Sequence, residues 1–394
     1  MANKYTTLAD LFTAIANSIR AKKNSTDVIV ADNFPTEIDN LKVGGFDYNN
    51  TDITSIPDYA FYGCEDLTSV DCCNLTSVGT SAFENCKNLK SVVLCEGVES
   101  IGENAFKGCS EDLIIYCMFE NIPETWNENW NPDNCDVVCA TPVETWDISA
   151  TSNDNVTAKL YNDLSNDGMY LLIISGTGEI KSYSALSIPW RSDTYRKYIK
   201  TAIIRYGITN IMKYMFSSCS ALSDIFISKG IVSISESAFM TTSITNFIIP
   251  KGVTHINDGA FSECSNLSNI VIPDRVTNIG IIDDRESTPT NGAFGDCKKL
   301  RSIIIPDSVK IIGTRTFQGA TTLSSVTIGN GVTRIGYQAF HRCYSLTSII
   351  YTGTISQWNA ISFGTSWNHS TGNYTIHCTD GDIAKDGTIT YHNT

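Results

Sequence analysis

Short groups of apolar residues, separated by polar turns, recur along most of the chain. Leu267, Ile270 and Ile272 form one such group, and Val276 and Ile279 form the next. Apolar residues two positions apart predict a strand whose alternate side chains point inward. The glycine after Ile279 is a residue that permits a tight corner. Each group is too short to bury its own apolar edge, so the pattern predicts units that stack and share a continuous core.

A phenylalanine at nearly constant spacing marks the repeat, and a cysteine follows it three positions later in most copies. One interval is longer than the others because residues 281–290 form an insertion of about one loop. The pattern predicts a β-rich repeat solenoid of nine ~23-residue coils in two arrays, of three and six. The nine phenylalanines are Phe61, Phe83, Phe106, Phe216, Phe239, Phe261, Phe294, Phe317 and Phe340.

The full coil, Leu-x-x-Ile-x-Ile-Pro, Val-x-x-Ile-Gly and Ala-Phe-x-x-Cys, closely resembles the BspA-like branch of the leucine-rich repeats. This group is typical of bacterial surface proteins. The resemblance covers residues 53–118 and 208–351. It implies a right-handed solenoid that is used for adhesion or protein binding, and it implies no particular ligand.

Two segments that lack the repeat, 119–139 and 352–378, each contain two tryptophans and close on a cysteine. An open solenoid end exposes its core, so we interpret both segments as caps whose tryptophans pack over the last coil. Stacking of a ligand on these tryptophans is the alternative. Residues 141–207 form a β-rich segment with strands over 171–174 and 176–180, and Asp167-Gly168 predicts a hairpin turn. We expect this segment to cap the start of the second array.

The N-terminus has a different pattern, with apolar residues at helical spacing over residues 7–22. This spacing predicts a short amphipathic helix, and Gly44-Gly45 ends the following extended stretch as a linker. The block resembles N-terminal segments of phage and prophage tail-associated proteins; the alternative is a helix that caps the first coil. The predicted organisation is therefore 1–45, helix and linker; 46–140, first array and cap; 141–207, lead-in; and 208–394, second array and cap.

The net charge of −14 arises from 28 basic and 42 acidic residues, and no run of Lys or Arg occurs. Nucleic acids and anionic membrane surfaces attract the opposite charge, so both are unexpected partners. No apolar stretch approaches the ~18 residues of a transmembrane helix, and the N-terminus lacks the pattern of a secretion signal. We expect the chain to act outside the cell, on a cell surface or a virion, without inserting into the membrane.

Fourteen cysteines require an explanation. Seven lie three positions after a repeat phenylalanine, and a second column comprises Cys73, Cys95, Cys117 and Cys139, which are equally spaced at one repeat length. Stacked Cβ atoms lie near the ~4.8 Å strand spacing, whereas a disulfide needs about 3.8 Å, so we predict free buried thiols. A soft-metal site in the second column is the alternative, although zinc prefers four converging ligands. We predict no metal and no cofactor.

No catalytic residue can be named. The five histidines form no HExxH motif, and no GxSxG nucleophile elbow occurs. An enzyme built on a solenoid scaffold is a rival hypothesis, but no motif supports it. We predict that the chain is not an enzyme.

One surface feature indicates binding. The fifth position of Leu-x-x-Ile-x-Ile points outward, yet it is apolar in most coils, and polar residues such as Ser268 and Asn269 flank it. An outward apolar stripe predicts a recognition surface; the alternative is that β-branched residues simply suit strands. We predict a non-catalytic module that binds a protein or glycan on a cell surface, or alternatively a phage or prophage tail-associated host-recognition protein. The stripe comprises Val93, Phe226, Ile248, Val271, Ile304, Thr327 and Ile350, with its centre between Phe226 and Ile304.

Overall fold

The computed structural model describes residues 55–392, except 65–66, 68, 73–74, 120, 163–167, 206, 228–229 and 283–291. The chain divides into two compact units, Met1–Pro142 and Val143–Thr394, and each has its own hydrophobic core. The predicted N-terminal helix and linker lie outside the described residues.

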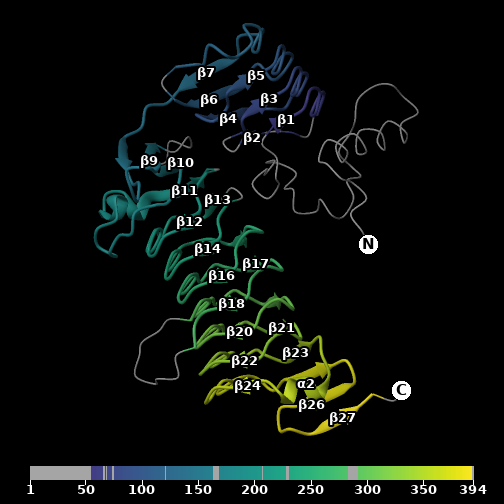
Figure 1. The fold of residues 1–394 in the computed structure, drawn as a ribbon. Coiled ribbons are helices and arrows are strands. Elements are labelled where there is room, and N and C mark those ends of the chain that lie inside the picture. Colours follow the sequence, from purple (N-terminus) through teal and green to yellow (C-terminus); the bar gives the residue numbers. More distant parts are fainter. Residues whose placement is uncertain are drawn as a thin grey trace, which may run out of the picture. The chain divides into compact units, whose positions relative to one another are not determined.

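The first unit consists of two short parallel sheets, to which three coils contribute one strand each, and β7 adds a fourth strand to one of the sheets (Figure 1). One sheet contains β1 (Ser55–Ile56), β3 (Ser77–Val78) and β5 (Ser100–Ile101). The other contains β2 (Ser69–Asp71), β4 (Ser91–Cys95), β6 (Ile114–Met118) and β7 (Asp136–Cys139). All neighbouring pairs are parallel.

The second unit repeats this arrangement over more coils, and its strands follow one another like rungs in Figure 1. One face is a continuous seven-stranded sheet of two-residue strands. These are β12 (Asn210–Ile211), β14 (Ser233–Ile234), β16 (His255–Ile256), β18 (Asn278–Ile279), β20 (Ile311–Ile312), β22 (Arg334–Ile335) and β24 (Ser362–Phe363). The other face carries β13 (Asp224–Ile227), β15 (Asn246–Ile248), β17 (Asn269–Val271), β19 (Ser302–Ile305), β21 (Ser325–Ile328), β23 (Ser348–Tyr351) and β25 (Thr375–Cys378).

A β-rich lead-in begins the second unit. β8 (Glu144–Asp147), β9 (Asn155–Asn162) and β10 (Tyr170–Thr177) are antiparallel, and β10 then pairs in parallel with β11 (Ile199–Ile204). β11 pairs with β13, so the lead-in joins the first coil of the array. The antiparallel pairing of β9 with β10 confirms the predicted hairpin. The two strands predicted over 171–180 are wrong, because β10 continues through Gly176 to Thr177 as one strand.

The described parts of the two units together contain about 13 parallel turns, which corrects the predicted nine coils. The additional turns include those of β7, β10, β11 and β25, which pair in parallel with their neighbours although they lack Ala-Phe-x-x-Cys. The pairing of β10 with β11 has one register shift, between Tyr170 and Leu171. A search for that motif finds the turns with a core phenylalanine and misses the terminal turns. At the end of the second unit, α2 (Ile355–Asn359), β26 (Gly381–Ala384) and β27 (Ile389–Tyr391) follow the last coils.

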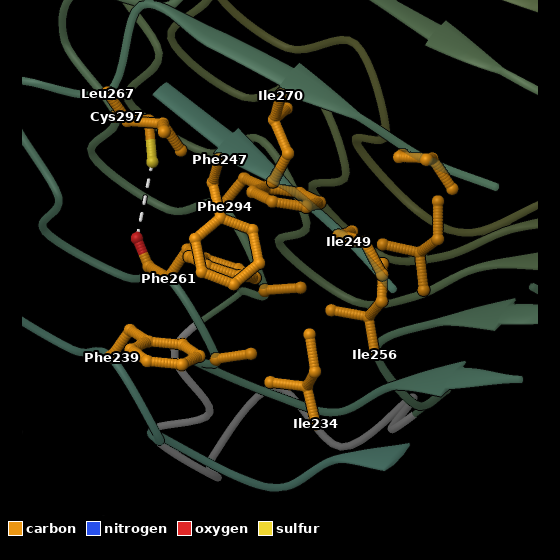
Figure 2. Packing of buried hydrophobic residues seen from close by; sticks show 14 of the residues in the cluster. Ile234, Phe239, Phe247, Ile249, Ile256, Phe261, Leu267, Ile270, Phe294 and Cys297 are labelled. Carbon is orange, nitrogen blue, oxygen red and sulfur yellow. Dashed lines mark hydrogen bonds between the residues drawn. The ribbon is translucent and has the colours of Figure 1, made fainter. Parts of the chain in front are cut away.

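The repeat phenylalanines form a ladder of stacked rings in the core of each unit. Ring centroids of successive phenylalanines lie 5.3 and 5.4 Å apart in the first unit and 5.2 to 5.5 Å apart in the second. Phe261 and Phe294 stack at 5.4 Å although the insertion lies between them in the sequence, so the ladder continues without interruption. Figure 2 shows Phe239, Phe261 and Phe294 in this stack.

A tryptophan ends each ladder. Trp130 lies edge-on to Phe106 at 5.9 Å, and Trp367 lies edge-on to Phe340 at 6.0 Å. A second tryptophan in each cap, Trp126 or Trp358, is buried against the first. The prediction that these tryptophans pack over the last coil is confirmed.

Most repeat cysteines bind the neighbouring coil through a hydrogen bond. The Cys297 thiol donates to the Phe261 carbonyl at 3.2 Å, as Figure 2 shows. The same contact recurs from Cys86 to Phe61, Cys109 to Phe83, Cys264 to Phe239 and Cys343 to Phe317. All of these thiols are free, which confirms the prediction for this column. Their role is structural, because the thiol adds a second hydrogen bond, from the next coil, to a carbonyl that already accepts one within its own coil.

The second cysteine column differs from its prediction. Cys95 is disulfide-bonded rather than free, and Cys73 lies outside the described residues. Cys95 pairs in register with Met118, and Cys117 pairs with Leu94. Equal spacing keeps register only between coils of equal length, and the coil that joins these two strands is one residue longer than the coil that follows it. Among the described members of the column, only Cys117 and Cys139 stand directly opposite each other.

The glycine after the second apolar group has the expected role at Gly280, where φ is +71°, and a different role in other coils. A Cβ at Gly79 would lie 2.4 Å from the Asp58 nitrogen, and one at Gly364 would lie 2.4 Å from the Tyr337 nitrogen. Neither glycine has a positive φ. At Gly79 and Gly364 the glycine is therefore needed because the backbones of neighbouring coils approach closely, and not because the chain turns sharply there.

Candidate ligand-binding face

The outward stripe lies on the strands from β13 to β23, and the alternation of each strand places it there. In β19, Ile303 and Ile305 are buried while Ile304 faces solvent. β23 has the same alternation, with Ile350 exposed. In the first unit, Val93 on β4 also occupies an outward position but is only half-exposed. The predicted direction of these side chains is therefore confirmed; their role in binding stays a prediction.

Exposure along the stripe rises from the lead-in to Ile304 and is lower at Thr327 and Ile350 beyond it. Ile203, which pairs with Phe226, is 1% exposed. Phe226 and Ile248 are half-buried, whereas Val271, Ile304 and Ile350 are 46%, 68% and 43% exposed. The accessible part of the stripe is thus centred on Ile304, nearer the C-terminus than the sequence suggested.

Strand pairing divides the stripe into segments. Ile248 stands opposite Val271, and Ile304 is joined through Thr327 to Ile350. Within the part of the chain that the structure describes, β17 and β19 belong to different ladders. The longest hydrogen-bonded segment of the stripe therefore begins at Ile304.

The hydroxyl groups beside the stripe are largely engaged within the solenoid. Ser268 donates to the Thr245 carbonyl at 3.0 Å, and Ser324 donates to the Arg301 carbonyl at 3.1 Å. Thr347 donates in turn to the Ser324 carbonyl. Each bond joins one coil to the preceding coil. These donors stabilise the stack, so the face offers a ligand mainly aliphatic contact.

A polar group ends the stripe, and sequence analysis missed it. His377 on β25 stands opposite Ile350, in the same column. Its Nδ1 lies 2.9 Å from Asp382 Oδ1, and His392 Nε2 lies 3.5 Å from the same oxygen. β25 lies outside the repeat motif, so the only available signal was the alternation that ends at Cys378.

No arrangement typical of a metal site occurs among the described residues, since no group of three or more His, Cys, Asp or Glu side chains converges suitably. Burial raises the pKa of the core thiols, for example that of Cys343 to about 12. Such thiols stay protonated near neutral pH and are poor nucleophiles and metal ligands. No helix in the described ranges combines the length and apolarity that a membrane span requires.

The family comparison agrees with this architecture. The model for the BspA type leucine rich repeat region matches six copies, over residues 37–124, 194–281 and 288–379. The chain belongs to the BspA-type leucine-rich repeat family. No match supports the resemblance of residues 1–45 to phage tail-associated proteins. No curated protein matches this BspA-type chain at a significant level.

Solved structures of bacterial leucine-rich repeat proteins are similar at low identity. A leucine rich cell surface protein from Faecalibacterium prausnitzii is 20% identical, with 79% of this chain and 86% of that chain covered and a TM-score of 0.25. A leucine-rich repeat protein from Bacteroides ovatus is 18% identical, with coverages of 82% and 88% and a TM-score of 0.30. The leucine-rich repeat protein of T. pallidum is 21% identical, with coverages of 52% and 83% and a TM-score of 0.29. These TM-scores are too low to support further argument, so the assignment of the chain to its family rests on the match to the family model.

Proposed function

We propose that this BspA-type chain is a non-catalytic binding module that acts outside the cell and recognises a cell-surface protein through the stripe around Ile304. The observation that carries the proposal is the exposure of Val271, Ile304 and Ile350 on one face. A soluble solenoid has no internal need for large aliphatic side chains in water. Stacked repeats present extended surfaces of this kind to their partners.

The chemistry of the face favours a protein over a glycan as partner. A glycan offers many hydroxyl groups and needs donors and acceptors in return, but several hydroxyls beside the stripe already bind backbone carbonyls. The transfer of an apolar protein patch from water to an aliphatic surface is favourable in free energy. His377 and Asp382 supply a polar rim at one end.

Two substitutions in the stripe and one matched control test the proposal. Val271→Asp and Ile304→Asp introduce a charge into the stripe, whereas Val232→Asp changes a valine that is equally exposed, at 51%, but lies off the stripe. Truncating or charging a central contact costs about 2 kcal/mol or more, so we expect binding to cells to fall on the order of 30-fold for the stripe variants. Because all three positions face solvent, melting temperatures change by only a few degrees.

Flow cytometry with the labelled full chain measures how strongly each variant binds to cells that bind the wild-type protein. Protease treatment of the cells is expected to abolish binding, and periodate oxidation of their glycans is expected to preserve it. The opposite pattern would identify a glycan. Equal binding by all three variants would remove the stripe from the function, and unfolding of Ile304→Asp would show that the column is buried.

A further inference from the structure

Cys117 and Cys139 depart from the pattern of the other cysteines. They stand directly opposite each other on β6 and β7, and both occupy the inward side of their strands. Cys117 is fully buried, whereas Cys139 is exposed because β7 is the last strand of its sheet. The column that follows the phenylalanines instead donates to backbone carbonyls. The pair therefore combines a buried thiol with a neighbour that solvent reaches.

The geometry of the pair is compatible with a covalent bond. Adjacent strands lie about 4.8 Å apart, within the Cα separation of roughly 4.4 to 6.8 Å that disulfides span, and the bond requires the Cβ atoms to approach from that spacing to about 3.8 Å. Burial raises the pKa of Cys117 to about 12, and the charge and hydrogen bonding of the adjacent Cys139 add to the rise. Cys95, on neighbouring β4, is already disulfide-bonded.

We propose that Cys117 and Cys139 form a redox-active pair that is oxidised to a disulfide by exchange with a low-molecular-weight disulfide. The Cys139 thiolate attacks one sulfur of the small disulfide, forming a mixed disulfide and releasing one thiolate, which takes a proton from water. Cys117, whose raised pKa makes it a poor nucleophile toward reagents in solution, attacks only the adjacent Cys139 Sγ of the mixed disulfide, and its proton passes to the departing sulfur, which leaves as the second small thiol. The two protein thiols are oxidised by two electrons, and the small disulfide is reduced to two thiols.

Surface charge determines which small disulfide reacts well. Residues 46–142 contain 17 acidic and only 3 basic residues, so they account for the entire net charge of −14. Asp136 lies on β7 itself, three positions before Cys139. An anionic reagent is repelled by this field and a cationic one is concentrated by it, to a degree that salt reduces. Exchange is therefore expected to favour the dication cystamine over anionic oxidised glutathione.

The test uses the full chain with either reagent, followed by acid quenching, alkylation and mass analysis. A Glu-specific protease separates the two cysteines, because Glu124 and Glu128 lie between them. The wild type is expected to lose two hydrogens and yield a Cys117–Cys139 crosslink. The reaction with cystamine should be at least tenfold faster than with oxidised glutathione, and high salt should reduce this ratio.

Three variants separate the steps. Cys117→Ser is expected to stop at a stable mixed disulfide on Cys139, and Cys139→Ser is expected to react at neither position. Cys135→Ser, which removes a half-buried thiol of the same unit, should crosslink like the wild type. A wild type that accumulates the mixed disulfide, joins Cys139 to Cys135 or remains unmodified would overturn the proposal. Circular dichroism of each variant before exchange shows that it has folded.

Discussion

In the first unit three phenylalanines stack and end on Trp130, and in the second unit six stack and end on Trp367. The solvent-exposed surfaces of the two arrays are much less alike than their cores. The first array carries the whole net charge, whereas residues 143–394 contain 20 acidic and 20 basic residues. The first array has a half-buried Val93 at the outward position, and the second exposes Ile304 at 68%. The core is constrained by ring stacking and inter-coil hydrogen bonds, so differences accumulate where packing imposes nothing.

The largest expected effect is a loss of stability at alkaline pH. It tests whether the shared core or the differing surface governs the stability of the two arrays. Buried thiols with raised pKa values keep their protons in the folded state, while unfolded thiols ionise above about pH 8.5. The stability that these thiols contribute is therefore fully present below that pH. It is lost as the pH rises toward the pKa values of the folded state, which are about 11 for Cys264 and about 12 for Cys109 and Cys219. Each thiol removes about 1.4 kcal/mol per pH unit in this window.

Urea unfolding followed by circular dichroism from pH 8 to 11 measures this loss. We expect both arrays to weaken together, and Cys264→Ser to make the decline in the second array less steep. If only the acidic first array weakened, surface repulsion and not the core thiols would control the alkaline response.

A core substitution in each array tests whether the two ladders are independent. Phe261 stacks between Phe239 and Phe294, and Phe83 stacks between Phe61 and Phe106. Phe→Ala changes in cores cost about 3–5 kcal/mol. Hydrogen exchange measured by mass spectrometry should show loss of protection only in the array that carries the change. Simultaneous loss in both arrays after Phe261→Ala would show that they unfold as one unit.

The smallest expected effect is the change in stability of the acidic first array when salt is added. Mutual repulsion of surface acids weakens the first array, and salt screens it. Added sodium chloride is expected to stabilise the first array by on the order of 1 kcal/mol and to leave the neutral second array nearly unchanged. Equal stabilisation of both arrays would indicate a general salt effect and would remove charge from the comparison.

Sequence periodicity predicted the structure correctly where a single residue type fills a single packing position in each coil. The phenylalanine interval located the core ladder, and the Trp-containing segments were correctly interpreted as caps. The same reasoning missed the turns of β7, β10, β11 and β25, because strand pairing there does not require a phenylalanine. It also misaligned Cys95 with Cys117, since one coil is a residue longer than its neighbour.

The candidate site could be predicted only in part. Alternation alone indicated that Ile304 and Val271 point outward, because successive side chains of a strand face opposite sides. It could not show that Ile203 would be buried in the same column, that Ser268 would donate to the preceding coil, or that His377 would stand beside Ile350. Each of these depends on residues that lie a full coil or more away in the chain.

The sequence by itself therefore determined the repeat, the composition of the core, the direction of each strand residue and the acidity of the first array. These properties follow from local patterning and from charges that need no partner. Tertiary structure decided the register of Cys117 with Cys139, the close approach at Gly79 and the exposure gradient along the stripe. Those depend on how one coil lies against the next, and a shift of one residue between coils changes which side chains meet.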